Sequence, residues 1–369
     1  MIDDLIINAQ KNLHVSSAST ASYEEKKEKL VEYVDKELAR HPSLDELIGQ
    51  NSIQMMHDNH VNHINFMLNV FKLNKFEMLV KIVPWVYRAY HSHGFSYDYF
   101  IVELNAWKQA ISLYLEKSEA DEIHAVYDWL LDQHEIMIKL SETPSAMISE
   151  VLPEWKEIQE SFLSFLLDGD FASCLSMSEQ IVQTPEQIKN FYIQVIQPSL
   201  YGIGTLWEKG KISVAEEHLA SAIVGRITAN IYTRFRRKRG GKGKILVTSA
   251  PNEFHEIGSR ILADLLEFDG WDVFYLGANT PKKELFKLIK KIRPKILAIS
   301  VCMPFNIDRA TDIISSLKSD KEISKIKVIV GGIAFNSFPE LWSSIGADGW
   351  APDGEAAVIL VNQLAARSL

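Results

Sequence analysis

The chain has 369 residues, of which 47% are hydrophobic, and it carries a formal net charge of -9. This length predicts two to three domains with substantial cores. The acidic balance argues against nucleic-acid binding, because contact with a phosphate backbone requires a basic face. No apolar run reaches the roughly 18 residues that a membrane span requires, so we expect no membrane insertion. The first residues lack the basic start of a signal peptide, and we therefore expect a cytoplasmic protein.

Cysteine usage agrees with a reducing compartment. Cys174 and Cys302 lie far apart in the chain and form no spaced disulfide or metal framework. A structural metal held by cysteines is therefore not expected.

The N-terminal part, residues 1–145, is predicted to be an all-helical domain. Apolar residues recur at helical spacing from about residue 22 to 140, for example in 23–34 and 99–111. The first twenty residues, with a Ser/Thr-rich stretch at 16–20, are expected to be poorly ordered. A linker is predicted at 141–145. The domain is rich in aromatic residues and contains five histidines, most of which we interpret as core or surface residues: His57, His60, His63, His91 and His93.

The next part, residues 150–238, again shows helical periodicity. Short polar breaks at 168–170 and 184–186 divide it into about four helices, which predicts a small four-helix bundle. A basic, glycine-rich run covers residues 234–244. Cations stabilise the C-terminus of a helix and glycines favour a flexible connection, so we interpret this run as a helix end followed by a linker rather than a nucleic-acid site.

From residue 243 to 369 the pattern changes to alternating strands and helices. Apolar runs at 245–247, 273–276, 296–300 and 328–330 are each followed by a helix-like segment, and a weaker fifth run lies near 349–351. Such alternation indicates a parallel sheet with helices on both faces. The predicted fold class is therefore multidomain, α plus α/β, with a C-terminal Rossmann-like, flavodoxin-like domain of five parallel strands.

The pattern E-x-H-x-x-G directly after the first of these strands is the strongest chemical signal. Glu253, His255 and Gly258 supply it. Ligands of open α/β sheets bind outside the carboxyl ends of the strands, where His255 could present one ring nitrogen to a metal. Glu253 could accept a hydrogen bond from the other nitrogen, and Gly258 would let a bulky ring approach the backbone. The alternative is a loop histidine paired with a nearby glutamate.

Residues 150–369 resemble the cobalamin-binding unit of B12-dependent photoreceptors of the CarH and LitR type, which has a four-helix cap followed by a Rossmann-like domain. The resemblance implies that His255 binds cobalt from below. Ser300, at the end of the third strand, and Gly331-Gly332, after the fourth, match the serine and double glycine of the groove that takes the nucleotide tail in that family.

A second pattern, W-x9-E-H, matches the cap signature of the same family through Trp207, Glu217 and His218. An indole could pack against an adenosyl group, and the carboxylate and imidazole could form hydrogen bonds with its ribose or adenine. The alternative is a core tryptophan and a helix surface. The repressor branch has a histidine after the tryptophan, whereas this chain has Glu208, so trapping of cobalt by that neighbour is in doubt.

The resemblance implies a light sensor that binds adenosylcobalamin base-off and His-on and changes its conformation or assembly when light breaks the cobalt–carbon bond. It implies a homo-oligomer whose state depends on light and an unidentified downstream protein partner. The alternative function is a corrinoid carrier of a methyltransferase system. We identify no nucleophile and base for turnover, so no independent enzyme activity is expected.

The photoreceptor repressors carry a DNA-binding domain at their N-terminus, and this chain has an acidic helical domain instead. A helical domain ahead of a cobalamin unit is similar to the arrangement of the photocobilins, which bind a bilin close to B12. The similarity implies biliverdin in residues 1–145, with Arg88 and the histidines near its propionates. No cysteine precedes Cys174, so a thioether link there is excluded.

Overall fold

The computed structural model describes residues 2–143, 151–235 and 241–366. They divide into two compact units: residues 1–146 with 208–210, and residues 147–207 with 211–369. The predicted linkers, at 141–145 and within 234–244, lie partly outside the described residues, because 144–150 and 236–240 are not among them.

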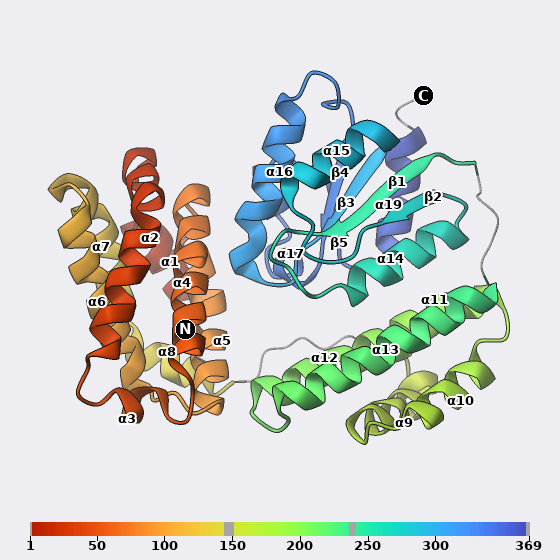
Figure 1. Cartoon of the computed structure of the whole chain (residues 1–369), viewed down its shortest axis with the longest axis horizontal. Helices are drawn as coiled ribbons and strands as arrows, with labels where there is room; N and C mark the ends of the chain where they lie inside the picture. Colours follow the sequence, from red (N-terminus) through yellow and green to blue (C-terminus); the bar gives the residue numbers. More distant parts are fainter. Residues whose placement is uncertain (1, 144–150, 236–240, 367–369) are drawn as a thin grey trace. The chain divides into compact units, whose positions relative to one another are not determined.

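The first unit is helical (Figure 1). Helix α2 packs against α4 and α6, and α5 packs against α8. The expectation of poor order before residue 20 is wrong, because Leu5 and Ala9 are buried and the Ser16 side chain caps α2 by accepting a hydrogen bond from the Ser19 N–H. The helices are α1 (Ile2–Asn12), α2 (Ser17–Ala39), α3 (Leu44–Ile48), α4 (Ile53–Leu73), α5 (Glu77–Ser92), α6 (Asp98–Tyr114), α7 (Lys117–Asp132) and α8 (His134–Ser141).

Polar side chains tie these helices together inside the first unit. His57 and His60 on α4 each place Nδ1 2.6 Å from a carboxylate oxygen of Asp35 on α2. The Nε2 atom of the fully buried His60 lies 2.9 Å from the Tyr99 hydroxyl. Buried polar groups need such partners, since an unsatisfied one destabilises the core. These histidines therefore have a structural role.

The second unit begins with a helical cap. A short 3-10 turn, η1 (Pro153–Trp155), precedes α9 (Lys156–Leu167) and α10 (Phe171–Ile181). Helix α11 (Pro185–Phe191) continues through a π-helical segment, η2 (Tyr192–Ile196), into α12 (Gln197–Glu208), and α13 (Val214–Phe235) completes the cap. The polar breaks predicted from the sequence fall between α9 and α10 and at the start of α11. The described part of the cap, residues 151–235, therefore contains four helices, because α11, η2 and α12 form one continuous helix.

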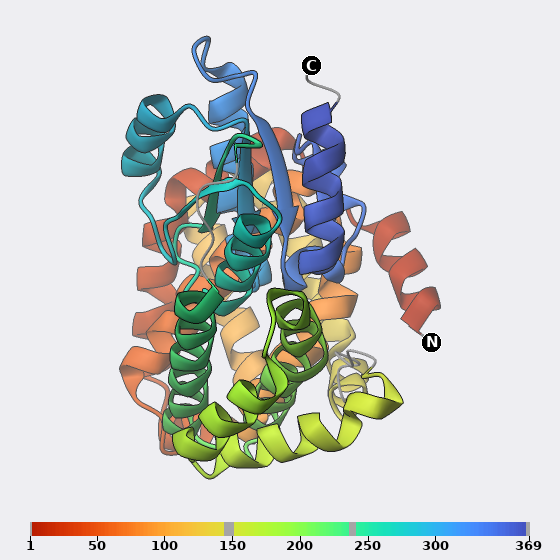
Figure 2. The same ribbon diagram turned by 90° about the vertical axis from the view of Figure 1, so that its right-hand side faces the viewer.

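The sheet follows the cap and has helices on both of its sides (Figure 2). All pairings are parallel and the order is β2-β1-β3-β4-β5, which confirms the predicted five-stranded flavodoxin-like domain. The elements are β1 (Lys244–Ser249), α14 (Ile257–Phe268), β2 (Asp272–Tyr275), α15 (Lys282–Ile292), β3 (Ile296–Ser300), η3 (Pro304–Asn306), α16 (Ile307–Ser319), β4 (Lys327–Gly331), α17 (Ile333–Asn336), α18 (Leu341–Ser344), β5 (Gly349–Ala351) and α19 (Gly354–Ala366).

The register aligns the carboxyl ends of three strands. Ser249 of β1 pairs with Ser300 of β3, and Ser300 pairs with Gly331 of β4. The chain reverses its direction of winding between β1 and β3, and ligands of such sheets bind outside this switch point. Within the described residues, no helix has both the length and the apolar character to cross a membrane.

Candidate functional site

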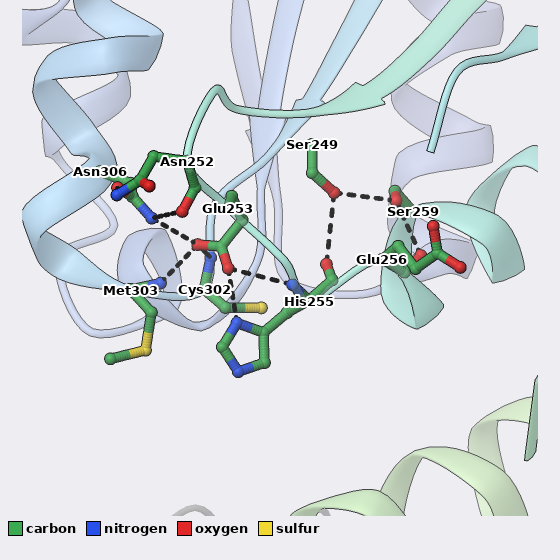
Figure 3. Close-up of polar contacts among 9 residues, drawn as sticks. All are labelled: Ser249, Asn252, Glu253, His255, Glu256, Ser259, Cys302, Met303 and Asn306. Atoms are coloured by element: carbon green, nitrogen blue, oxygen red, sulfur yellow. Dashed lines mark hydrogen bonds and ion pairs between the residues drawn. The ribbon is translucent and has the colours of Figure 1, made fainter. Parts of the chain in front are cut away.

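The loop between β1 and α14 is built around one buried carboxylate (Figure 3). Glu253 is fully buried, and its Oε1 accepts hydrogen bonds from the His255 backbone N–H at 3.2 Å and from His255 Nδ1 at 2.5 Å. Its Oε2 accepts from the N–H groups of Cys302 and Met303, at 2.9 and 2.8 Å, and from Asn306 Nδ2 at 3.2 Å. The loop after β3 therefore fixes the Glu253 carboxylate, which in turn orients the His255 ring.

These contacts shift both ionisation equilibria towards a charged pair. Burial alone would raise the pKa of Glu253, but its hydrogen bonds and the charge of His255 outweigh burial and lower the pKa below its ordinary value. Burial would lower the pKa of His255, but Glu253, with a smaller contribution from Glu217, raises it. The carboxylate stays ionised as an acceptor, so Nδ1 of His255 carries the proton.

The arrangement suits a single axial metal ligand. The His255 side chain is 58% exposed, and Nδ1 faces Glu253, so Nε2 points away from it. The described residues contain no group of three or more His, Cys, Asp or Glu side chains that could hold a metal ion. A metal bound here therefore needs its other ligands from elsewhere, as in a macrocycle, and the residues present fit such a group.

At the neighbouring strand ends, segments of backbone lie close to one another. Gly332 has a φ of +96°, and a Cβ there would lie 2.3 Å from the Val301 carbonyl oxygen. Gly331 is less crowded but still tight, because an added Cβ would lie 3.2 Å from the Ala351 carbonyl oxygen. An added Cβ on the exposed Gly258 would meet nothing within 4 Å. The protein itself thus requires glycine at 332, and any need for glycine at 258 comes from a ligand.

The cap residues predicted from the second pattern lie on two helices of the second unit. Half-buried Trp207 lies near the end of α12, and Glu217 and His218 lie in the first turns of α13. The His218 side chain is 75% exposed, and Ser221 donates a hydrogen bond to Glu217. Because Glu217 contributes to the pKa of His255, the fold brings this carboxylate within electrostatic range of the His255 loop.

Several residues of this site were missed by sequence reasoning. Asn306 is buried and bonds to Glu253, and it belongs to no recognisable pattern because it lies 53 positions away. Ser249 donates to the His255 carbonyl and also contacts Ser259, which fixes the other end of the loop. The contact of Asn306 with Glu253 depends on the pairing of β1 with β3, which no local motif contains.

Comparison with known proteins defines the class. Residues 243–359 match the model of a B12 binding domain, and residues 158–232 match a second model of a B12 binding domain. The fold, the exposed imidazole and these two matches identify a cobalamin-binding protein.

Proteins of two kinds are among those similar to this chain. Dimethylamine corrinoid protein 1 of Methanosarcina mazei is 25% identical over 214 residues, which cover 57% of this chain and 94% of that protein. The HTH-type transcriptional repressor CarA of Myxococcus xanthus is 28% identical over 216 residues, 58% of this chain and 70% of the repressor. The structure of the Methanosarcina barkeri monomethylamine corrinoid protein aligns with a TM-score of 0.51 at 16% identity, covering 57% of this chain and 99% of that one, which supports the fold.

Removal of the Asn306 amide tests how the glutamate is held. In Asn306→Ala we expect cobalamin affinity to fall roughly 10- to 100-fold, since groups that orient a metal ligand have effects of that size. Titration of the protein into cobalamin, followed by absorbance, measures the change. The matched variant Asn306→Asp keeps the shape of the side chain but replaces the Nδ2 donor with an oxygen acceptor. Its cobalamin affinity should be as low as that of Asn306→Ala or lower. Parent-like affinity in both variants would contradict this role.

Proposed function

We propose that this protein is a light sensor that holds adenosylcobalamin base-off, with His255 as the lower axial ligand. The observation that supports it is the polar start of α13, where Glu217 lies within electrostatic range of the His255 loop and 3.5 Å from Nε2 of the exposed His218. A carboxylate and an imidazole can form hydrogen bonds with the ribose and adenine of an adenosyl group. A methyl group offers no such partner.

The chain's residues divide the work between the two halves of the second unit. Glu253 orients His255 from below, and we assign the nucleotide tail to the strand ends at Ser300, Gly331 and Gly332. The cofactor, when bound, supplies a cobalt–carbon bond that visible light can break. Trp207, Glu217 and His218 of the cap respond to the loss of the adenosyl group, and the signal passes on through altered protein contacts, first within a homo-oligomer and then to a protein partner.

Size-exclusion chromatography with in-line visible absorbance tests the proposal. The protein is reconstituted with adenosylcobalamin and run once in darkness and once after green light. Co-elution with a light-dependent change in size is the expected result. Co-elution without any change under light would contradict the sensor.

The second candidate is a corrinoid carrier for methyl transfer. Its support is that curated corrinoid proteins of methylamine metabolism match the chain over a similar span and at similar identity to the repressor. The fold serves both functions and does not decide between them. Carriers usually have aspartate at the position of Glu253, which favours the sensor. Retention of adenosylcobalamin in preference to methylcobalamin would favour it further.

A bilin in the first unit stays a prediction. Arg88 forms an ion pair with Glu208, and His57 and His60 contact Asp35, so these side chains already have protein partners. Addition of biliverdin to the purified protein, followed by gel filtration at red wavelengths, tests for binding.

A further inference from the structure

The long cap helix changes its winding at the point where it meets the sheet domain. Residues Tyr192–Ile196 form a π-helical segment between α11 and α12. Such segments are frequent at functional sites, because they displace side chains from regular helical positions. Tyr192 is fully buried, and its hydroxyl donates a hydrogen bond of 2.9 Å to Asp264 Oδ2 on α14. A carboxyl group therefore lies inside the contact between the cap and the sheet domain.

The surroundings of Asp264 are apolar. The residue is 8% exposed, and Ile261 and Leu265 on the same helix join the hydrophobic core of the cap. Burial raises the pKa of Asp264 to about 7, against the opposing effects of the Tyr192 hydrogen bond and the charge of Arg260. Glu267 raises it further, and it also accepts a hydrogen bond from Tyr232 of α13. Asp264 thus changes charge near neutral pH, unlike a solvent-exposed aspartate.

Helix α14 connects this contact to the cobalt-ligand loop. It begins at Ile257, directly after the loop that holds Glu253 and His255. Ser259, in its first turn, contacts Ser249 at the end of β1. A displacement of α14 at Asp264 therefore moves residues that contact both ends of the loop between β1 and α14.

We propose that buried Asp264, with its partner Tyr192, forms a pH-responsive latch between α14 and the cap. The latch loosens as the carboxyl group ionises, because burying the charge costs more than the Tyr192 hydrogen bond and the charge of Arg260 recover. The direction follows from linkage. The pKa of Asp264 is higher in the folded protein than the ordinary value of 3.8, so the stabilising effect of the protonated group is present in acid and is lost as pH rises through about 7. The latch stands on the fold alone, and its effect on cobalamin retention rests on the function proposed above.

Hydrogen exchange of the full chain without cofactor tests the latch. Exchange rates are compared between the parent, Asp264→Asn and Tyr192→Phe, once at about pH 6 and once at about pH 8. At each pH the intrinsic exchange rate is the same for all three proteins, so it cancels from their ratio. From about pH 6 to pH 8, exchange of α13 and α14 in the parent should rise roughly tenfold relative to Asp264→Asn, the ratio that a shift of this size implies. In Tyr192→Phe the loss of the hydroxyl donor should move the rise to higher pH. A constant ratio between parent and Asp264→Asn would overturn the latch.

A second measurement separates the latch from the cofactor. The dissociation rate of adenosylcobalamin in darkness should rise with pH in the parent and remain lower in Asp264→Asn at about pH 8. Equal rates, together with the expected exchange result, would overturn the link to the cofactor site. A protein that exchanges as expected but retains no cobalamin would support the latch and overturn the proposed function.

Discussion

His255→Ala should lower the affinity for cobalamin by at least about tenfold and abolish the absorbance spectrum of the histidine-ligated form. The lower limit follows because even the groups that merely orient a metal ligand contribute 10- to 100-fold. The His255 side chain is 58% exposed, so its truncation removes little packing and the fold should be unchanged. Absorbance spectra of the reconstituted variant and a binding titration measure both effects.

Two controls isolate the role of the ring. His218→Ala also removes an exposed imidazole from the second unit, and it should keep the histidine-ligated spectrum. Added free imidazole should partly restore that spectrum in His255→Ala, because the truncated side chain leaves room for it. An unchanged spectrum in His255→Ala would remove the axial assignment.

Gly332→Ala should be the most destabilising small substitution at the site. The added Cβ would lie 2.3 Å from the Val301 carbonyl oxygen and 2.8 Å from its carbon, and the residue has a φ of +96°. Both contacts are with backbone, which cannot rotate away. Strain and overpacking together should cost about 2 to 5 kcal/mol, measured as a lower urea midpoint of the cofactor-free protein.

Gly258→Ala is the matched comparison. Its Cβ would meet no atom within 4 Å, and alanine favours a helix over glycine, so the urea midpoint should be equal or higher. If a ring lies against this backbone, cobalamin affinity should fall in Gly258→Ala although stability does not. A Gly332→Ala protein as stable as the parent would show that the turn after β4 can move.

The sheet domain was largely predictable from sequence because its central strands β1, β3 and β4 are buried on both faces. Continuous apolar runs such as Ile296–Ser300 mark them, and parallel pairing places their ends at one edge. Glu253 and His255 were found because two positions of separation fit one loop. Asn306 was not, because its contact with Glu253 depends on how β1 and β3 lie side by side.

The helical parts were predictable in kind but less so in detail. Helix α1 has only 11 residues, and its order depends on the burial of Leu5 and Ala9 by the rest of the unit. Pro198, two residues after the π-helical segment, marks an irregularity in the helix because it lacks a backbone N–H, but a proline alone does not specify a π-helical turn. The histidines of α4 show helical spacing, but their partner Asp35 comes from a different helix.

The Glu253 carboxylate accepts five hydrogen bonds, two on Oε1 and three on Oε2, and all of them come from the protein's own groups. The orientation of the imidazole therefore depends on groups of the protein itself. A preorganised loop loses little conformational entropy when a ligand arrives. The unfavourable ordering entropy of cobalamin binding should then come from the cap and the cofactor's own nucleotide tail, and the rate of capture should depend on how often the cap opens.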